Sequence, residues 1–204
     1  MKSLELYLVA SKEDKSKESF LNILELSIKA GVSMIQLREK KLSSKEFYEL
    51  GLSVKALCDS FKIPLIINDR LDIALALDAS GVHLGQDDLP LKEARRLLGE
   101  QKIIGLSVQN LAQLKYIKGA NYLGCGAVFK TNTKEDAKLI GLENLALLCE
   151  KSSLPVFAIG GINEGNIKEL RGIKLAGIAV VSAIMKAESP FEASLRLKKE
   201  VQSL

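Results

Sequence analysis

The chain has 204 residues, of which 47% are hydrophobic and 26% are charged. These values are ordinary for a soluble folded protein and argue against disordered, collagen-like and low-complexity architectures. The length suits one domain, so we expect residues 1–204 to form a single unit with a substantial core.

Charge and cysteine content indicate which partners the protein is expected to bind and in which cellular compartment it works. The net charge is only +4, with the cations spread along the chain, which does not favour nucleic acid as a partner. No apolar run approaches the ~20 residues of a membrane span, and residues 1–7 carry no long apolar h-region. Cys58, Cys125 and Cys149 cannot all pair within the chain, which suits a reducing compartment. We expect a cytoplasmic protein without membrane association, and a homo-oligomer is one open alternative.

Short apolar runs alternate with longer stretches of helical period along the whole chain. This alternation is typical of a parallel sheet whose strands are joined by crossover helices. The predicted strands are Leu4–Val9, Met34–Leu37, Pro64–Ile67, Gly81–Leu84, Ile103–Leu106, Tyr122–Gly124, Pro155–Ile159 and Gly177–Val181.

The gaps between these runs hold apolar residues at intervals of three or four, as in a helix with one buried face. The spacing predicts buried positions at Phe47, Leu50, Val54 and Leu57, and at Leu91, Ala94 and Leu97. Ser43 and Ser189 are predicted helix caps, each followed by an acid in the first turn. Pro190 stands at a first helical position, where proline is favoured.

Eight strand–helix units predict a (β/α)8 TIM barrel, an α/β fold with outer helices. An open doubly wound sheet also alternates, but it usually has fewer strands and a glycine-rich fingerprint after the first one. Here the first predicted strand is followed by Ala10, Ser11 and Lys12, without that fingerprint.

Polar residues after the strands have a functional interpretation, because the active sites of such barrels lie at the carboxyl ends of the strands. Gln36, Arg38 and Lys40 alternate after the second strand and face the same way if the chain is still extended. Two cations and an amide suit a phosphate or diphosphate. The alternative is a solvated strand end.

Carboxylates follow the third and fourth strands at Asp69 and Asp88. Hard oxygen ligands at one rim are typical of a Mg²⁺ site that also takes substrate phosphates, so these two aspartates are the predicted metal ligands. In the alternative interpretation, Asp87 or Asp88 caps the helix that begins near Pro90.

Candidate binding residues also follow the sixth, seventh and eighth predicted strands. Residues 124–134 combine glycines with Lys130, Thr131, Thr133 and Lys134, which indicates an anion-binding loop or, equally, a plain surface turn. Gly160 and Gly161 allow close approach of a ligand to the backbone, and Ser182 stands where a short helical turn follows the last strand.

Single polar residues elsewhere carry less weight. Ser107 can donate to a phosphate, although a lone serine is usually structural. His83, the only histidine, is interpreted as a core or rim residue rather than a catalytic base, and Cys125 as a buried inert thiol.

In combination, these motifs resemble the thiamine-phosphate synthase family over almost the whole chain. The motifs occur in the family's order. They are Leu6-Tyr7-Leu8-Val9, Gln36-Leu37-Arg38-Glu39-Lys40, Ile67-Asn68-Asp69-Arg70, Gly81-Val82-His83-Leu84-Gly85-Gln86-Asp87-Asp88 and Ala158-Ile159-Gly160-Gly161-Ile162.

The resemblance implies that the chain joins a hydroxymethylpyrimidine diphosphate to a hydroxyethylthiazole phosphate with Mg²⁺, by dissociative loss of diphosphate. It implies pyrimidine diphosphate contacts for Gln36, Arg38, Lys40, Asn68, Ser107 and Lys134, and metal ligation by Asp69 and Asp88. It implies thiazole phosphate contacts for Thr131, Thr133, Gly161, Val181 and Ser182. Among these, Arg38, Lys40, Lys134 and Ser107 are the predicted catalytic residues, because charge neutralisation and positioning drive such a reaction.

The chain departs from the family pattern at Ala127 and Lys130 in the sixth exit and at Gln109 after Ser107. Related thiazole tautomerases use a histidine in the region of Gln109, so the absence of a histidine there favours the synthase. A tautomerase and a non-catalytic thiamine-phosphate-binding regulator remain the alternatives.

Overall fold

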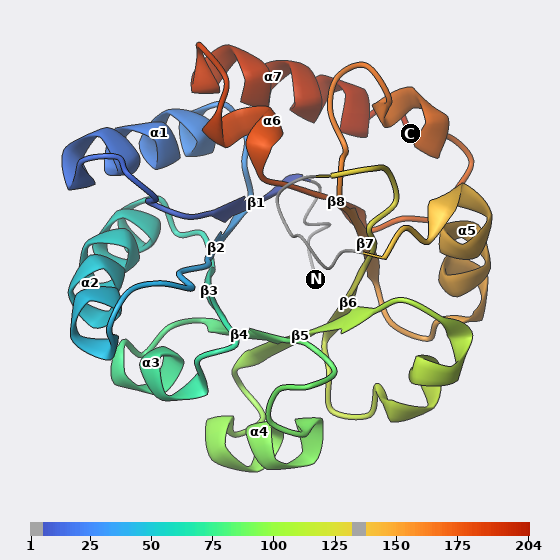
Figure 1. Cartoon of the computed structure of the whole chain (residues 1–204), viewed down its shortest axis with the longest axis horizontal. Helices are drawn as coiled ribbons and strands as arrows, with labels where there is room; N and C mark the ends of the chain where they lie inside the picture. The colour runs from blue at the N-terminus through green and yellow to red at the C-terminus, as the bar shows by residue number, and fades with distance from the viewer. Residues whose placement is uncertain (1–5, 132–137) are drawn as a thin grey trace.

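The computed structural model describes residues 6–131 and 138–204, within which eight parallel strands form a closed barrel. Each strand pairs with the next in sequence, and β8 pairs with β1 (Figure 1). The predicted (β/α)8 barrel is confirmed, and only the predicted start of the first strand, at Leu4, lies outside the described residues. The strands are β1 (Leu6–Ala10), β2 (Met34–Leu37), β3 (Leu65–Asn68), β4 (Gly81–Leu84), β5 (Ile103–Val108), β6 (Tyr122–Cys125), β7 (Val156–Ile159) and β8 (Gly177–Val180).

The helices surround the barrel as an outer ring (Figure 1). They are α1 (Lys17–Lys29), α2 (Ser44–Ser60), α3 (Leu71–Ala76), α4 (Leu91–Leu98), α5 (Gly141–Lys151), α6 (Ser182–Met185) and α7 (Pro190–Val201), with 3₁₀ segments η1 (Leu111–Tyr116) and η2 (Ile167–Leu170). The expectation of an amphipathic α-helix in every gap is wrong after β5 and β7, where the connections are η1 and η2. Both connections use 3₁₀ turns, which are tighter than α-helical turns and commonly serve as connectors.

The strand limits differ from the prediction by one or two residues. Pro64 and Pro155 precede their strands, because proline has no N–H for the ladder. β5 extends to Val108 and β6 to Cys125, whereas Val181 leaves the sheet and caps α6.

The predicted helix starts at Ser43 and Ser189 are confirmed. The Ser43 hydroxyl accepts from the Glu46 N–H at 3.3 Å, and the Glu46 carboxylate accepts from the Ser43 N–H at 2.9 Å. Ser189 accepts from the Glu192 N–H at 3.4 Å. The first pair forms a capping box, which satisfies N–H groups that the helix itself leaves unpaired.

The buried helix positions follow the predicted period except near the ends of α2 and α4. Phe47, Leu50 and Val54 are buried as expected, whereas Leu57 is only partly buried and Cys58 is buried in its place. In α4, however, Leu97 is 44% exposed, and Leu98 is buried in its place. The helix is only two turns long, so one residue of phase decides which leucine faces the barrel.

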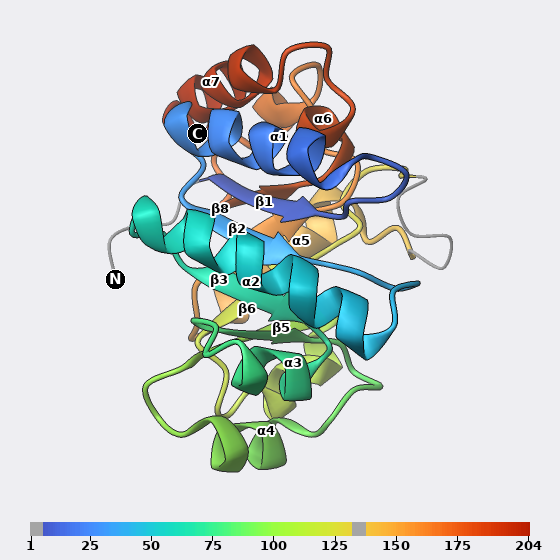
Figure 2. The same ribbon diagram turned by 90° about the vertical axis from the view of Figure 1, so that its left-hand side faces the viewer.

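The strands divide the core into two apolar layers. Alternate side chains point outward, where they pack under the helices, or inward, where they fill the barrel. The inward cluster consists of Tyr7, Val9, Met34, Ile66, Tyr122, Phe157 and Ala179. All strands run towards the same end, on the right in Figure 2, so their carboxyl ends share one rim.

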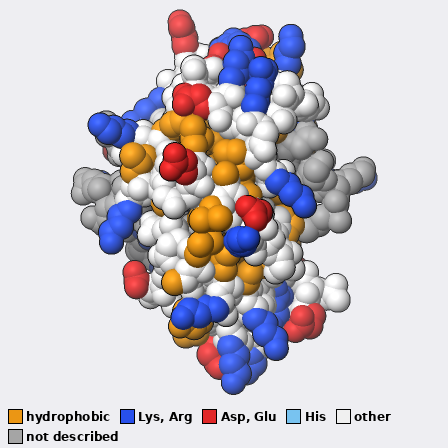
Figure 3. All heavy atoms as spheres, turned by 90° about the vertical axis from the view of Figure 1, so that its right-hand side faces the viewer, with side chains coloured by type: hydrophobic (Ala, Val, Ile, Leu, Met, Phe, Trp, Pro, Cys, Tyr) orange, Lys and Arg blue, Asp and Glu red, His pale blue; other side chains and the backbone are white. Residues whose placement is uncertain are grey.

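The outer surface is mixed. Figure 3 shows exposed hydrophobic side chains over the centre of the face that carries α5. Within η1 and α5, the exposed large hydrophobic residues are Leu111, Tyr116 and Leu147. Across residues 6–131 and 138–204, no helix combines the length and apolar character needed to cross a membrane.

Candidate active site

A cavity of about 390 Å³ opens at the carboxyl ends of the strands. It brings together every predicted site residue that the structure describes. These are Gln36, Arg38, Lys40, Asn68, Asp69, Asp88, Ser107, Thr131, Gly161, Val181 and Ser182. Thr133 and Lys134, also predicted, lie outside the described residues.

The exit of β2 keeps its alternation beyond the end of the strand. The Arg38 N–H donates to the Ala10 carbonyl at 2.9 Å, which continues the pairing with β1. Glu39 faces away from the cavity, accepting from the Lys12 N–H at 2.6 Å and the Ser11 hydroxyl at 3.2 Å. With Glu39 held there, Arg38 and Lys40 both line the cavity, as the alternation predicts.

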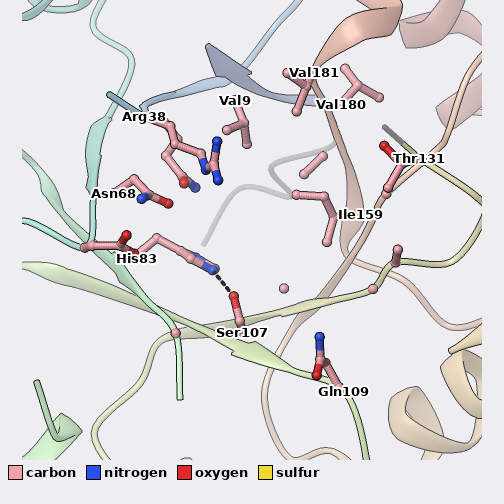
Figure 4. A pocket seen from close by; sticks show the side chains of 18 of the residues that line it. Val9, Arg38, Asn68, His83, Ser107, Gln109, Thr131, Ile159, Val180 and Val181 are labelled. Atoms are coloured by element: carbon pink, nitrogen blue, oxygen red, sulfur yellow. Dashed lines mark hydrogen bonds between the residues drawn. The ribbon is translucent and has the colours of Figure 1, made fainter. Parts of the chain in front are cut away.

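Arg38 and Asn68 point into the cavity from neighbouring strands (Figure 4). Neither side chain makes a hydrogen bond or ion pair with any residue in the described ranges. Asn68 is nevertheless buried, at 8% exposure. Polar groups held in a cavity with their donors unused are suited to bind a polar ligand.

The two predicted metal ligands meet at the rim. Asp69 directly follows β3 in the left-handed backbone region, at φ 58°, and its N–H donates to the His83 carbonyl at 2.8 Å. Asp88 accepts from the Gly85 N–H at 2.6 Å instead of capping α4, whose cap residue is Pro90. The two carboxyl groups lie within hydrogen-bonding reach of each other.

The pKa values of Asp69 and Asp88 are shifted in opposite directions. Burial raises the pKa of Asp88, and the neighbouring Asp69 carboxylate adds to the rise. Burial acts in the same direction on Asp69, but hydrogen bonds from Lys40 and Asp88 outweigh it, so the pKa of Asp69 is lowered. Two adjacent carboxylates repel each other when both are charged, and a cation between them removes this repulsion.

The donor set fits a hard divalent cation that shares its shell with a ligand. Lys40 already forms an ion pair with Asp69, which shows that the position attracts positive charge. In the part of the chain that the structure describes, no three His, Cys, Asp or Glu side chains form a metal cluster. Two carboxylates alone match Mg²⁺, which commonly takes one or two of them and completes its shell with water and substrate phosphates.

The opposite side of the cavity is formed by the exits of β6, β7 and β8. Gly160 and Gly161 have φ of 99° and 71°. A Cβ on Gly160 would lie 2.6 Å from Ala127, and one on Gly161 would lie 2.5 Å from the Lys130 carbonyl oxygen. We expected these glycines to let a ligand approach the backbone. In the structure, the space that their side chains would fill is occupied by the segment that follows β6.

Backbone hydrogen bonds hold the described parts of this segment, residues 126–131 and 138–140. The Val128 and Phe129 N–H groups donate to the carbonyls of Ile159 and Gly160, each at 3.0 Å. The Ala127 carbonyl accepts from the Ile140 N–H at 2.8 Å. Ala127 therefore lines the cavity as part of a backbone-paired stem.

A buried line of hydrogen bonds crosses the barrel beneath the cavity. The Gln36 amide donates to the Tyr7 hydroxyl at 2.5 Å, and the Tyr7 and Tyr122 hydroxyls are 2.8 Å apart. Tyr122 lies 3.0 Å from His83 Nδ1, and His83 Nε2 lies 2.9 Å from the Ser107 hydroxyl. Figure 4 marks the bond between His83 and Ser107 with a dashed line. Burial raises the pKa of both tyrosines.

Sequence reasoning missed part of this line. Tyr7 and Tyr122 were assigned only to strands, although alternation with the inward Val9 and Gly124 signals that they face the barrel interior. His83 is buried and lines the cavity, so its interpretation as a core or rim residue is confirmed. Gln86 and Gln109 also line the cavity.

His83 makes the stability of the metal-free protein depend on pH. Burial lowers the pKa of His83 to about 4, whereas an unfolded histidine titrates at about 6.5. The unfolded chain therefore binds the proton more tightly, and stability falls as pH drops through this window. We expect a loss of about 2 kcal/mol between pH 7.5 and pH 5 from this group.

Urea unfolding in EDTA at these two pH values, for the wild type and His83→Gln, isolates this effect. The variant contains no histidine, so its pH dependence should be weaker by that amount. An equal pH dependence in the two proteins would contradict the assigned pKa.

The cysteines do not contribute to the site chemistry. Cys58, Cys125 and Cys149 are buried and unpaired. Burial raises the pKa of the Cys125 thiol to about 12. A neutral thiol is a poor nucleophile, so the prediction that Cys125 is buried and inert agrees with the structure.

A (β/α)8 barrel with cationic and carboxylate side chains around its strand exits defines a class, that of barrel enzymes acting on phosphorylated small molecules. The model of the thiamine monophosphate synthase family matches residues 6–184. The chain belongs to this family.

Similar proteins span nearly the same length. A thiamine-phosphate synthase of Campylobacter jejuni is 59% identical over 97% of this chain and 94% of its own. One from Methanobrevibacter smithii is 48% identical over 98% and 96%. The solved structure of a thiamine phosphate pyrophosphorylase from Pyrococcus furiosus is 37% identical, with a TM-score of 0.89, over 98% and 96%.

Proposed function

We propose that the chain is a transferase that condenses 4-amino-2-methyl-5-hydroxymethylpyrimidine diphosphate with 4-methyl-5-(2-phosphoethyl)thiazole or its carboxylated form. The products are thiamine phosphate and diphosphate, and the carboxylated thiazole additionally releases carbon dioxide. The observation that carries this proposal is the meeting of Arg38, Lys40, Asp69 and Asp88 at one side of a single cavity. Family membership and relatives of similar length support it.

The reaction needs no protein base. The bond between the pyrimidine methylene carbon and the diphosphate oxygen breaks, and diphosphate leaves with the electron pair. The thiazole nitrogen then donates its lone pair to the resulting cation, forming the C–N bond without proton transfer. The only histidine is buried, with both ring nitrogens engaged in hydrogen bonds, which agrees with a reaction that requires no base.

Charge neutralisation is the main task of the diphosphate side. Arg38 offers a planar fork of donors and Lys40 a compact charge, which suit the oxygens of a leaving diphosphate. Asn68 and Gln36 bind and orient the pyrimidine diphosphate, and Ser107 donates to it. Preorganised charges of this kind lower the barrier because they do not need to reorganise during the reaction.

Asp69 and Asp88 would hold Mg²⁺. When bound, Mg²⁺ supplies positive charge that stabilises the diphosphate as it leaves. Lys40 would then be released from its ion pair with Asp69 and become available to the diphosphate.

The other side of the cavity is proposed to hold the thiazole phosphate. Thr131, Gly161, Val181 and Ser182 line it there. By their positions in the family motif, Thr133 is proposed to add a hydroxyl there, and Lys134 is proposed to contact the pyrimidine diphosphate. Substrates held on opposite sides of one cavity face each other, so the enzyme gains rate by alignment.

The coupling reaction tests this function. Purified protein is incubated with Mg²⁺ and both substrates, and the mixture is oxidised so that thiamine phosphate gives fluorescent thiochrome. We expect signal that requires both substrates and is lost with EDTA. Omission of each component in turn provides the controls.

The same assay distinguishes the alternatives. Isomerisation of the thiazole carboxylate phosphate without coupling would identify a tautomerase. Binding of thiamine phosphate without turnover in either assay would identify a regulator. Gln109 stands where related tautomerases have a histidine, so we do not expect isomerisation. We do not expect a regulator either, because a sensor has no need of the Asn68, Asp69 and Asp88 set that suits a metal diphosphate.

We further propose that the protein works in the cytoplasm. Its three cysteines are unpaired and buried, which agrees with a reducing compartment. A homo-oligomer remains the alternative to a monomer, and sedimentation of the purified protein measures which state it adopts.

A further inference from the structure

The hydrogen bonds across the barrel have a direction that follows from counting protons. Gln36 Nε2 donates to the Tyr7 hydroxyl. A tyrosine hydroxyl has one proton, which Tyr7 must then give to its other partner, Tyr122, at 2.8 Å. Tyr122 accepts this bond, so it gives its own proton to His83 Nδ1 at 3.0 Å.

The direction continues through the imidazole ring to the cavity. With Nδ1 accepting, a neutral His83 carries its proton on Nε2 and donates it to the Ser107 hydroxyl oxygen at 2.9 Å. The Ser107 hydroxyl proton is then not used by His83. Ser107 lines the cavity, so that proton is available to a ligand there.

A charged His83 does not fit this line. Nδ1–H would donate to Tyr122, and Tyr122 would have to donate to Tyr7. Tyr7 would then accept from both Tyr122 and Gln36, leaving its own proton without an acceptor among its contacts.

The other end of the line also reaches the cavity. Gln36 lines the cavity, and its Nε2 is engaged by Tyr7. The second polar atom of this amide, Oε1, can only accept a hydrogen bond, so Gln36 offers an acceptor to a ligand.

The barrel interior is shaped around this line. A Cβ on Gly105 would lie 2.2 Å from Tyr122 Cζ and 2.4 Å from His83 Nδ1. A Cβ on Gly124 would lie 3.0 Å from His83 Cε1. The two glycines therefore let the rings of Tyr122 and His83 occupy the positions that join Gln36 to Ser107.

We propose that Gln36, Tyr7, Tyr122 and His83 form a one-way hydrogen-bond relay that fixes Ser107 as a donor into the cavity and Gln36 Oε1 as an acceptor. Tyr7, Tyr122 and His83 are thus positioning residues. Under the proposed function, on which this consequence rests, Ser107 donates to a diphosphate oxygen, which has no proton of its own to offer. Gln36 accepts from the amino group of the pyrimidine.

The tautomer of His83 tests the relay independently of activity. Because the chain contains one histidine, protein labelled with ¹⁵N-histidine gives a single imidazole spin system. Long-range ¹H–¹⁵N correlation spectra at pH 7 should show the proton on Nε2 and a bare Nδ1. A proton on Nδ1, or an even mixture of tautomers, overturns the proposed direction even if the coupling reaction is observed.

Substitution tests whether the relay sets this tautomer. Tyr7→Phe removes a hydroxyl that contacts neither His83 nor the cavity, so a fall in the Nε2–H population identifies transmission through Tyr122. We also expect binding of inorganic diphosphate with Mg²⁺ to weaken about fivefold, the effect of roughly one hydrogen bond. Tyr116→Phe, at an exposed tyrosine, is the matched control and should change neither measurement. An unchanged tautomer in folded Tyr7→Phe contradicts the relay.

Discussion

Replacement of Arg38 by alanine is expected to lower kcat/KM for the coupling reaction by about 10²- to 10³-fold, the usual effect of losing one preorganised donor to developing negative charge. The Arg38 guanidinium points into the cavity and has no protein partner among the described residues (Figure 4). Its function is therefore towards a ligand. The thermal unfolding midpoint should change little, because no ion pair within the described chain is lost.

Two further variants sharpen this prediction. Arg38→Lys keeps the charge but loses the planar fork, so its activity should lie between those of the wild type and Arg38→Ala. Lys41→Ala removes a nearby exposed cation that does not line the cavity and should leave kcat/KM within about twofold. Full activity in Arg38→Ala would overturn the assignment of the diphosphate side.

Asp69→Asn is expected to lower kcat by about 10²- to 10³-fold and to raise the Mg²⁺ concentration needed for half-maximal rate. The substitution removes one of two carboxylates at the rim while keeping the size of the side chain. Asn tolerates the left-handed backbone at this position, where φ is 58°, so the fold should be retained. Steady-state rates measured over a Mg²⁺ series, with circular dichroism for the fold, provide the test.

Asp72→Asn is the matched control. Asp72 lies in the first turn of α3 and pairs with Arg70 on the surface, where its side chain is 62% exposed. Loss of an exposed pair changes stability by less than about 1 kcal/mol, and the Mg²⁺ dependence should equal that of the wild type. If Asp69→Asn and Asp72→Asn behave alike, Asp69 is not a metal ligand.

The barrel could be predicted because its strands are buried on both faces. Such strands appear in the sequence as short continuous apolar runs, and the limits of most were correct within one or two residues. The connections were harder to predict. Leu97 and Leu98 both suit a buried helical position, and only packing against the barrel decides between them.

The site could be predicted where residue type and strand position agree. Arg38, Asp69 and Asp88 follow strands, and parallel strands bring their ends to one rim, so their proximity follows from the topology. The pairing of Lys40 with Asp69 could not be predicted in this way, because side-chain contacts between strand exits depend on loop geometry.

The relay inside the barrel was not predictable from residue type. Tyrosine in a buried strand is usually a packing residue, and Tyr7 and Tyr122 are far apart in the sequence. Their contact depends on both facing the barrel interior at matching heights, which requires the register across several strands. The need for glycine at position 105 could also not be predicted, because it depends on the positions of the Tyr122 and His83 rings that lie against it.

Binding of inorganic diphosphate, measured by calorimetry with and without Mg²⁺, tests most directly whether the cavity holds a metal-bound diphosphate. We expect diphosphate to bind in the presence of Mg²⁺. In EDTA its affinity should fall at least about tenfold, which corresponds to at least about 1.4 kcal/mol of binding free energy. Arg38→Ala should not bind it measurably. Diphosphate that binds equally well without Mg²⁺, or equally well to Arg38→Ala, would contradict the account.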